Sequence, residues 1–297
     1  MIPAKILLFG EHIIIKGAQA LVIPFPHFGG EWKYAKTDEN YKEKQMDLAQ
    51  FAKFLEQESL PVQFDTQQFQ QDLSNGLYFD SNIPTGYGLG SSGSVTAAVY
   101  ERYSVDKQGV MVGSEVDDLS FLKVLFSQME SFFHGMSSGI DPLICSVRQP
   151  IWLESKNEMQ TISCEPLENA SLFLLDTKIS RSTSPFVKIY LKNWEEKEYA
   201  DFLIENLFPE SNKAIQQYRK GEGQKLFQTI HKISEIQSDY FSQMIPSDFK
   251  KVWKQGLNGD DFKLKLCGAG GGGFILGITK DFEKTKTILS GYNLIRL

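Results

Sequence analysis

The feature that most constrains this chain is a glycine- and serine-rich stretch at residues 84–95, PTGYGLGSSGSV, which leads directly into a helical pattern. Glycine has no Cβ, so such a stretch lets the backbone approach a bulky ligand closely and expose consecutive N–H groups. Val95, Ala98 and Val99 share one face of the expected helix, and a helix N-terminus adds a partial positive charge. The stretch therefore predicts a loop that binds phosphate.

These residues alone leave the type of phosphate loop open. Gly88, Gly90 and Gly93 match the GxGxxG pattern of dinucleotide-binding loops, but no buried strand follows the helix to complete a βαβ unit. The chain also lacks a Walker A lysine after these glycines and the signature motifs of protein kinases. Neither Ser91 nor Ser92 has the flanking glycines of a hydrolase nucleophile turn. A flexible loop with a serine N-cap is the purely structural alternative.

The rest of the pattern predicts an α+β fold of two domains. A chain of 297 residues is long for one domain, and its strands and helices mix without regular βαβ alternation. The segment EPLENA separates two strand patterns, which gives domains 1–168 and 169–297. In the N-terminal part, strands are expected for AKILLF, HIII, ALVI and EWKYAK. Further strands are expected near residues 150–154, 159–164 and 171–177. Two more, FKLKL and FILGI, are expected on either side of a glycine block. Helices are expected at 41–58, about 120–134 and most of 183–256, and a hairpin is expected at Asn75-Gly76.

Composition and charge exclude several classes of protein. The net charge of −6 without a basic stripe disfavours a nucleic-acid-binding protein. Three widely spaced cysteines give neither a disulfide framework nor a zinc motif. No secretory signal pattern and no apolar run of membrane-spanning length is present. We therefore expect a cytoplasmic protein with no membrane partner.

Two further stretches point to a ligand near the backbone. The N-terminal PAKILLFGEHIIIKG carries Lys5, Glu11 and His12 on an expected strand and the turn after it. Taken alone, Lys5 fits a strand-end lysine whose ammonium reaches solvent. Near the C-terminus, CGAGGGGF at residues 267–274 has five glycines in six positions, which is more than a hairpin or bulge requires.

The stretch ESFFHGMSSGIDP places Glu130, His134 and Asp141 around the end of one helix and the start of the next. Glu130 and His134 are four residues apart and so lie on the same side of a helix. Taken alone, they fit a solvated acid and a histidine at a helix C-terminus. Asp141 followed by Pro142 fits a helix N-cap with proline at the first helical position.

Taken together, these stretches resemble the GHMP kinase superfamily and, within it, the mevalonate kinases. PAKILLFGEH is similar to the first family motif, PTGYGLGSSG to its ATP loop and CGAGGGGF to its third motif. ESFFHGMSSGID resembles the segment that joins a metal-binding glutamate to the catalytic aspartate, and LLDTKISRST resembles the strand and turn that begin the second domain. The resemblance implies an α+β, two-domain fold with the active site in the cleft between an N-terminal and a ferredoxin-like C-terminal domain.

The resemblance also implies a reaction, the Mg²⁺- and ATP-dependent phosphorylation of the primary hydroxyl of mevalonate to 5-phosphomevalonate in isoprenoid precursor synthesis. Asp141 would accept the hydroxyl proton with Lys5 beside it, and Ser92 and Glu130 would hold Mg²⁺. The residues implied in binding the ATP phosphates are Gly86, Gly88, Leu89, Gly90, Ser91, Ser92, Gly93 and Ser94. Those implied in substrate binding are Lys5, Glu11, His12, His134, Asp141, Thr183, Gly270 and Gly271.

The chain departs from the family pattern at a few positions. Ala4 replaces a usual glycine, Gly93-Ser94 stands where small alanine-like residues are common, and Ser137 replaces a usual proline. The alternatives are a GHMP kinase for another small alcohol or for phosphomevalonate, a nucleotide-binding regulator without catalysis, and a dinucleotide-dependent oxidoreductase. The expected partners are mevalonate and ATP, without nucleic acid or membrane, and the expected state is a monomer or a homodimer.

Overall fold

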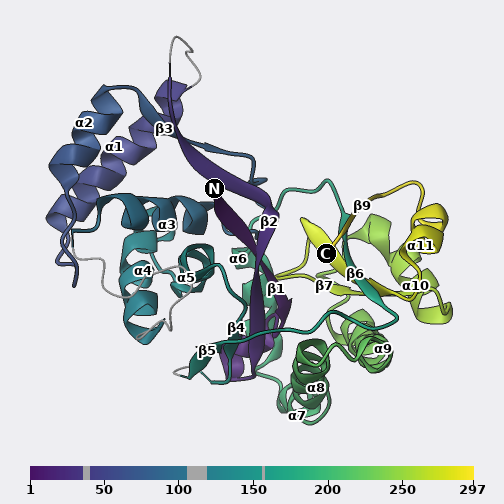
Figure 1. The fold of residues 1–297 in the computed structure, drawn as a ribbon. Coiled ribbons are helices and arrows are strands. Elements are labelled where there is room, and N and C mark those ends of the chain that lie inside the picture. Colours follow the sequence, from purple (N-terminus) through teal and green to yellow (C-terminus); the bar gives the residue numbers. More distant parts are fainter. Residues whose placement is uncertain (36–40, 106–118, 156–157) are drawn as a thin grey trace. The chain divides into compact units, whose positions relative to one another are not determined.

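The computed structural model describes residues 1–35, 41–105, 119–155 and 158–297 (Figure 1). The chain forms two compact units, each built from several segments. Unit 1 contains Met1–Lys5, Ile23–Pro84 and Leu89–Gln149, and unit 2 contains Ile6–Val22, Thr85–Gly88 and Pro150–Leu297. No helix in the described ranges is long and apolar enough to cross a membrane. The domain boundary at residue 168 stays a prediction.

Unit 1 combines part of a sheet with five helices. The end of β2 (Ala20–Tyr34) pairs antiparallel with β3 (Leu77–Ser81). The helices are α1 (Tyr41–Gln57), α2 (Thr66–Ser74), α3 (Ser91–Tyr103), α4 (Leu119–His134) and α5 (Ile140–Val147). The predicted apolar face of α1 is buried at all four of its positions, Leu48, Phe51, Ala52 and Leu55. Burial of a stripe with this spacing is what stabilises a helix that is polar elsewhere.

Two expectations near turns are wrong. HIII is not a strand: Ile13–Lys16 form a short 3₁₀ helix, η1, because His12 and Gly17 both have positive φ and turn the chain at its two ends. Asn75-Gly76 is not a hairpin, because the preceding FQQDL belongs to α2. The carboxylate of Asp65 accepts a hydrogen bond from the N–H of Gln68, which caps that helix and favours it over a strand.

Unit 2 contains a four-stranded antiparallel sheet in the order β7-β8-β6-β9. Its strands are β6 (Ser171–Asp176), β7 (Phe262–Leu266), β8 (Phe274–Thr279) and β9 (Asn293–Arg296), with α11 (Phe282–Ile288) before the last strand. In chain order this is strand, helices, two strands, helix and strand, which is the ferredoxin-like arrangement that was expected.

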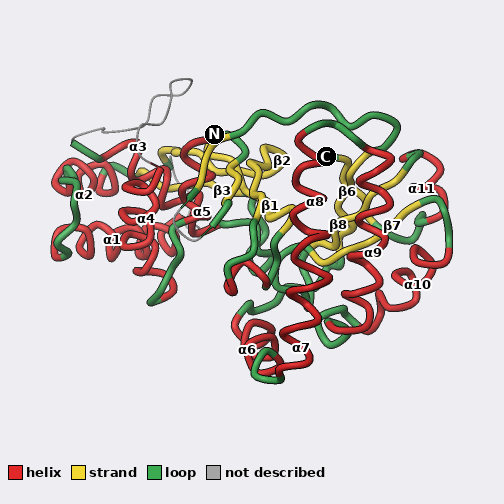
Figure 2. The backbone as a smooth tube through the Cα atoms, turned by 90° about the horizontal axis from the view of Figure 1, so that it is seen from below, coloured by secondary structure: helices red, strands yellow, loops and turns green. Residues whose placement is uncertain are grey.

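The long segment between β6 and β7 is helical, as predicted. It contains α6 (Ser184–Asn193), α7 (Lys197–Phe202), the π-helical η2 (Leu203–Leu207), α8 (Phe208–Arg219), α9 (Gly223–Tyr240), η3 (Ser247–Phe249) and α10 (Lys250–Asn258). α9 packs against β7 and β8, and α8 lies beside α9 (Figure 2). Leu226, Ile230 and Ile233 of α9 are buried at helical spacing and contribute to the core of unit 2.

A second sheet is formed by β1 (Ile2–Phe9), β2, β4 (Ile151–Leu153) and β5 (Met159–Thr161), in that order, with β3 also paired to β2. β1 and β2 each contribute residues to both units. The strands predicted near 150–154 and 159–164 correspond to β4 and β5. The mixed fold with two sheets confirms the α+β prediction.

Candidate active site

Lys5 and Asp141 form an ion pair within unit 1, with 2.9 Å between Lys5 Nζ and Asp141 Oδ1. The Lys5 side chain is 11% exposed and that of Asp141 is 33% exposed, so the pair is largely shielded but the carboxylate remains accessible. The N-cap role considered for Asp141 is wrong. Gly139 is the N-cap of α5, and Asp141 lies in the first turn, where its carboxylate is free to meet Lys5.

The second half of the glycine stretch lies directly beside this pair. The carbonyl oxygen of Leu89 accepts a hydrogen bond of 3.0 Å from the Lys5 N–H. α3 begins at Ser91 with Gly90 as its N-cap, in the left-handed conformation, so the serine N-cap of the purely structural alternative is wrong. A Cβ on Gly90 would lie 3.0 Å from Lys5 Cγ and 3.4 Å from Asp141 Oδ2. The helix N-terminus and the Lys5–Asp141 pair are therefore neighbours.

Gly93 and Ser94 serve contacts inside the protein. A Cβ on Gly93 would lie 2.7 Å from the carbonyl carbon of Asp141 and 2.7 Å from the nitrogen of Pro142, so α3 can approach α5 only through a glycine here. The Ser94 hydroxyl is buried and donates a hydrogen bond of 3.2 Å to the carbonyl oxygen of Ile2. The Ser94 N–H also donates a hydrogen bond of 2.8 Å, to the carbonyl oxygen of Gly90, so the predicted contact of Ser94 with a phosphate stays a prediction.

The first half of the glycine stretch belongs to unit 2. Gly86 has φ +78°, and its carbonyl oxygen accepts a hydrogen bond of 3.1 Å from the Arg181 N–H. A Cβ on Gly88 would lie 3.0 Å from Arg181 Nη2. These glycines therefore let the chain pass close to the segment around Arg181.

Ser92, Glu130 and His134 are linked by hydrogen bonds in unit 1. The Ser92 hydroxyl donates to Glu130 Oε1 at 2.7 Å, and His134 Nε2 lies 3.0 Å from the same hydroxyl oxygen. Glu130 is only 4% exposed. Burial, followed by the charge of Asp141, raises the pKa of Glu130, while hydrogen bonds from Ser137 and Ser92 oppose that rise.

The Ser92 and Glu130 side chains fit a divalent cation. They offer a hydroxyl and a carboxylate oxygen, which are the ligand types that Mg²⁺ prefers, and Mg²⁺ needs few protein ligands because it retains water. Burial and the charge of Asp141 both disfavour a negative charge on Glu130, whereas the charge of His134 favours it, and a bound cation would favour it further. The described ranges hold no cluster of three or more His, Cys, Asp or Glu placed for a metal.

In unit 2, Glu11 is held by other side chains. Glu11 Oε1 accepts hydrogen bonds of 2.7 Å from both Lys265 Nζ and Gln237 Nε2. Its second oxygen is buried and has no hydrogen-bond partner among the described residues. Glu11 thus forms a buried ion pair, and its second carboxylate oxygen has unused hydrogen-bonding capacity.

His12 is buried between the rings of Tyr190 and Phe241, with centroid distances of 5.2 and 5.6 Å. Its Nε2 lies 3.1 Å from the carbonyl oxygen of Ala269. Because a carbonyl oxygen only accepts, Nε2 carries the proton in the neutral ring. Burial lowers the pKa of His12 to about 4, so the ring is neutral at pH 7.

The glycine block of unit 2 is explained largely by packing. A Cβ on Gly270 would lie 2.6 Å from the carbonyl oxygen of Met244, and one on Gly271 would lie 2.0 Å from Phe186 Cζ. Both glycines have φ near +75°, which side chains rarely adopt. Their predicted role in substrate binding stays a prediction.

Comparison with known proteins extends these observations. A model described as GHMP kinases N terminal domain matches residues 48–149, which include the whole glycine stretch at residues 84–95, Glu130 and Asp141. The chain is 24% identical over 298 residues to a mevalonate kinase of Archaeoglobus fulgidus, covering 96% of this chain and 93% of the relative. It is 25% identical to a mevalonate kinase of Thermococcus sibiricus, covering 91% of this chain and 86% of the relative.

Solved structures agree at the level of the fold. A mevalonate kinase from methicillin-resistant Staphylococcus aureus has a TM-score of 0.59 at 19% identity, covering 99% of this chain and 96% of that one. A mevalonate kinase of L. major in complex with R-mevalonate has a TM-score of 0.65 at 17% identity, covering 97% of this chain and 89% of that one. The resemblance to the GHMP kinases is confirmed. The comparisons indicate a small-molecule kinase.

One residue of unit 2 that is suited to bind a ligand was not named from the sequence. Arg181 follows β6, and its Nη1 donates a hydrogen bond of 2.7 Å to Thr183 Oγ1. Its Nε is buried without a hydrogen-bond partner, and no carboxylate in the described ranges pairs with its guanidinium. A partly buried guanidinium without a carboxylate partner among the described residues is suited to bind an anion. The available signal was its position in the TKISRST stretch, two residues before Thr183.

Proposed function

We propose that this chain transfers the γ-phosphoryl group of Mg-ATP to the primary hydroxyl of mevalonate, giving 5-phosphomevalonate. The observation that carries the proposal is the Lys5–Asp141 pair at 2.9 Å, next to the N-terminus of α3. In this arrangement the proposed base, a positive charge and a helix N-terminus suited to bind phosphate lie together within one unit. The mevalonate kinase relatives support the choice of acceptor.

In this mechanism the protein positions the reactants and compensates charge, because phosphoryl transfer needs little covalent help. Asp141 accepts the proton of the attacking hydroxyl, and Lys5 places a positive charge beside the oxygen as it becomes negative. The backbone N–H groups at the start of α3 bind the phosphates. When bound, Mg²⁺ supplies charge neutralisation at the phosphates, and Ser92 and Glu130 would hold it.

Further residues named in the sequence analysis are proposed to bind the substrates. In unit 2, Arg181 and Thr183 would bind an anionic group of a substrate, and the second carboxylate oxygen of Glu11 and the neutral ring of His12 would contact a hydroxyl. His134, Gly270 and Gly271 are further proposed contacts. We also propose domains 1–168 and 169–297, a cytoplasmic location, and a monomer or homodimer without nucleic acid or membrane partner.

The fold alone does not select mevalonate, since a phosphomevalonate kinase of Streptococcus pneumoniae has a TM-score of 0.63 at 15% identity, covering 99% of this chain and 98% of that one. The test is ADP release from Mg-ATP with mevalonate, phosphomevalonate, galactose, homoserine or no acceptor. Turnover with mevalonate alone is expected. Turnover with another acceptor would keep the mechanism and change the substrate, and ATP binding without any turnover would favour a regulator.

A further inference from the structure

We propose that Ser137 is a positioning residue that fixes both the Glu130 carboxylate and the first turn of α5. The inference rests on the proposed phosphoryl-transfer function, because Glu130 and Asp141 have roles only in that reaction. It concerns a position at which the family resemblance led us to expect proline.

The Ser137 hydroxyl connects two elements of the site. It donates a short hydrogen bond to Glu130 Oε2, on α4. The same oxygen accepts a hydrogen bond of 3.0 Å from the N–H of Gly139, the N-cap of α5. Since Ser92 occupies Glu130 Oε1, each oxygen of this buried carboxylate receives one hydroxyl hydrogen bond. The orientation of the carboxylate is thereby defined from two sides.

The loop that carries Ser137 is itself held against α4. Ser127 Oγ donates a hydrogen bond of 2.6 Å to the carbonyl oxygen of Ser137. A Cβ on Gly139 would lie 2.1 Å from the carbonyl oxygen of Lys123 and 2.7 Å from the nitrogen of Ser127, so the loop packs directly on the α4 backbone. The hydroxyl of Ser137 is therefore presented from a rigid support rather than from an open loop.

The consequence for Asp141 follows from the helix start. Gly139 has φ +74° and begins α5, and Asp141 lies two residues further on, in the first turn. Fixing the Gly139 N–H fixes the direction in which α5 leaves the loop, and hence where the Asp141 carboxylate meets Lys5. One hydroxyl thus couples the proposed metal-binding residue to the proposed base. Proline has no hydroxyl to make either bond.

The test uses Ser137→Ala, Ser137→Thr and the control Ser131→Ala in the full chain. Ser131 is a good control because its hydroxyl bonds only within α4, to the carbonyl oxygen of Gln128, and takes no part in the site. ATP binding is measured by calorimetry over a range of Mg²⁺ concentrations without an acceptor. Hydrogen exchange at the Gly139 amide and thermal unfolding without metal are measured alongside.

For Ser137→Ala we expect the Mg²⁺ concentration that half-maximally strengthens ATP binding to rise about tenfold. The Gly139 amide should exchange faster, and Ser137→Thr should restore both properties. Ser131→Ala should behave like the wild type in both. Unchanged Mg²⁺ dependence in Ser137→Ala would overturn the proposal, as would a loss of thermal stability without any change in Mg²⁺ dependence. If ATP binding by the wild type did not depend on Mg²⁺, both the role of Ser137 and the proposed metal site would be overturned. If the wild type bound ATP but did not turn over mevalonate, only the proposed acceptor would be overturned.

Discussion

Lys5 on β1 and Asp141 on α5 are far apart in the chain, yet their charged groups are 2.9 Å apart within a single compact unit. The main chain of Lys5 is also bonded to Leu89, at the start of the helix that would bind phosphate. The proposed base, its neighbouring cation and the phosphate-binding helix end are therefore positioned together by folding. This arrangement leads to the first prediction.

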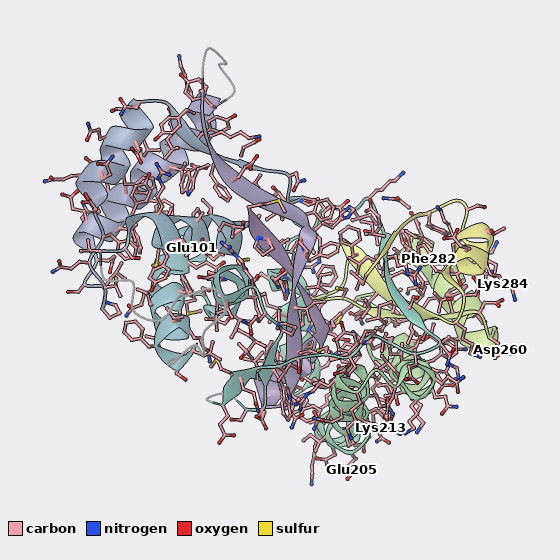
Figure 3. The ribbon with its side chains drawn as sticks, viewed as in Figure 1. Glu101, Glu205, Lys213, Asp260, Phe282 and Lys284 are labelled. Carbon is pink, nitrogen blue, oxygen red and sulfur yellow. The ribbon has the colours of Figure 1, made fainter. Side chains whose placement is uncertain are left out.

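Asp141→Asn and Lys5→Met should each reduce turnover by about 10²- to 10⁴-fold, because one removes the proton acceptor and the other the adjacent positive charge. ATP binding should be largely retained in both. The measurement is steady-state kinetics with calorimetric ATP binding. Lys284→Met and Asp261→Asn are matched controls, since both side chains of this ion pair of 2.6 Å are exposed. Figure 3 labels Lys284 on α11. Near-normal turnover in either Asp141→Asn or Lys5→Met would exclude the catalytic role of that residue.

Ser92→Ala and Glu130→Gln should each raise the Mg²⁺ concentration needed for half-maximal activity, by about tenfold, because each removes an oxygen ligand or its charge. The measurement is a magnesium titration of the initial rate. Glu101→Gln serves as the control, because Glu101 is a carboxylate in unit 1 that is already paired with Arg148 at 2.6 Å (Figure 3). If both titrations matched the wild type, neither residue would belong to the metal site.

His12 should make the free energy of unfolding depend on pH between 6.5 and about 4. In the unfolded chain the ring binds a proton below pH 6.5, whereas in the folded protein it does so only near pH 4, so protonation favours unfolding in this window. The contribution is fully present above pH 6.5, and about 3 kcal/mol should be lost as pH falls to 4. His12→Asn, which tolerates positive φ, should lack this loss. The free energy of unfolding is measured by denaturant unfolding of the wild type and His12→Asn at several pH values. The prediction would be contradicted if this free energy had the same pH dependence in both proteins.

Lys265→Met should lower the free energy of unfolding by about 3–5 kcal/mol, because it leaves the buried Glu11 carboxylate without its counter-charge. The double variant Glu11→Gln, Lys265→Met should recover a large part of this loss, since no uncompensated charge remains. Urea unfolding of the single and double variants measures the difference. Additive losses would show that the two charges do not depend on each other.

Gly93→Ala should destabilise unit 1 by about 1–3 kcal/mol and reduce turnover, because the added Cβ meets the backbone of Asp141 and Pro142 at 2.7 Å. Gly291→Ala is the control, as nothing lies within 4 Å of its added Cβ. Thermal unfolding and steady-state kinetics report the two effects. If Gly93→Ala had the thermal stability and turnover of the wild type, α3 and α5 could move apart without a loss of folding free energy.

Local pattern in the sequence was sufficient for much of the fold. The apolar stripe of α1 and the strands around the glycine block were predictable because each has a regular period and a clear boundary. HIII was misread because the positive φ of His12 converts an apolar run into a turn. FQQDL was misread because a single cap by Asp65 selects helix where the neighbouring Asn-Gly suggested a hairpin.

The site was predictable only in part. The resemblance identified Lys5 and Asp141, which the structure brings together, although neither stretch alone excluded a structural role. Arg181 was not named as a site residue although it lies in the TKISRST stretch, because the burial of its Nε without a hydrogen-bond partner is visible only in three dimensions. The bond from Ser137 to Glu130 was missed because it depends on how a loop folds back onto α4.

The close approach of Gly93 to Asp141 also changes how substitution tolerance in this loop should be interpreted. A scan of all substitutions, scored for folding alone, should reject side chains at Gly86 and Gly93 even when no nucleotide is present, because Ser180 and Asp141 already occupy that space. Intolerance of substitution at these positions would then reflect packing within the protein itself. Evidence for nucleotide contact would have to come from positions that folding leaves free to vary.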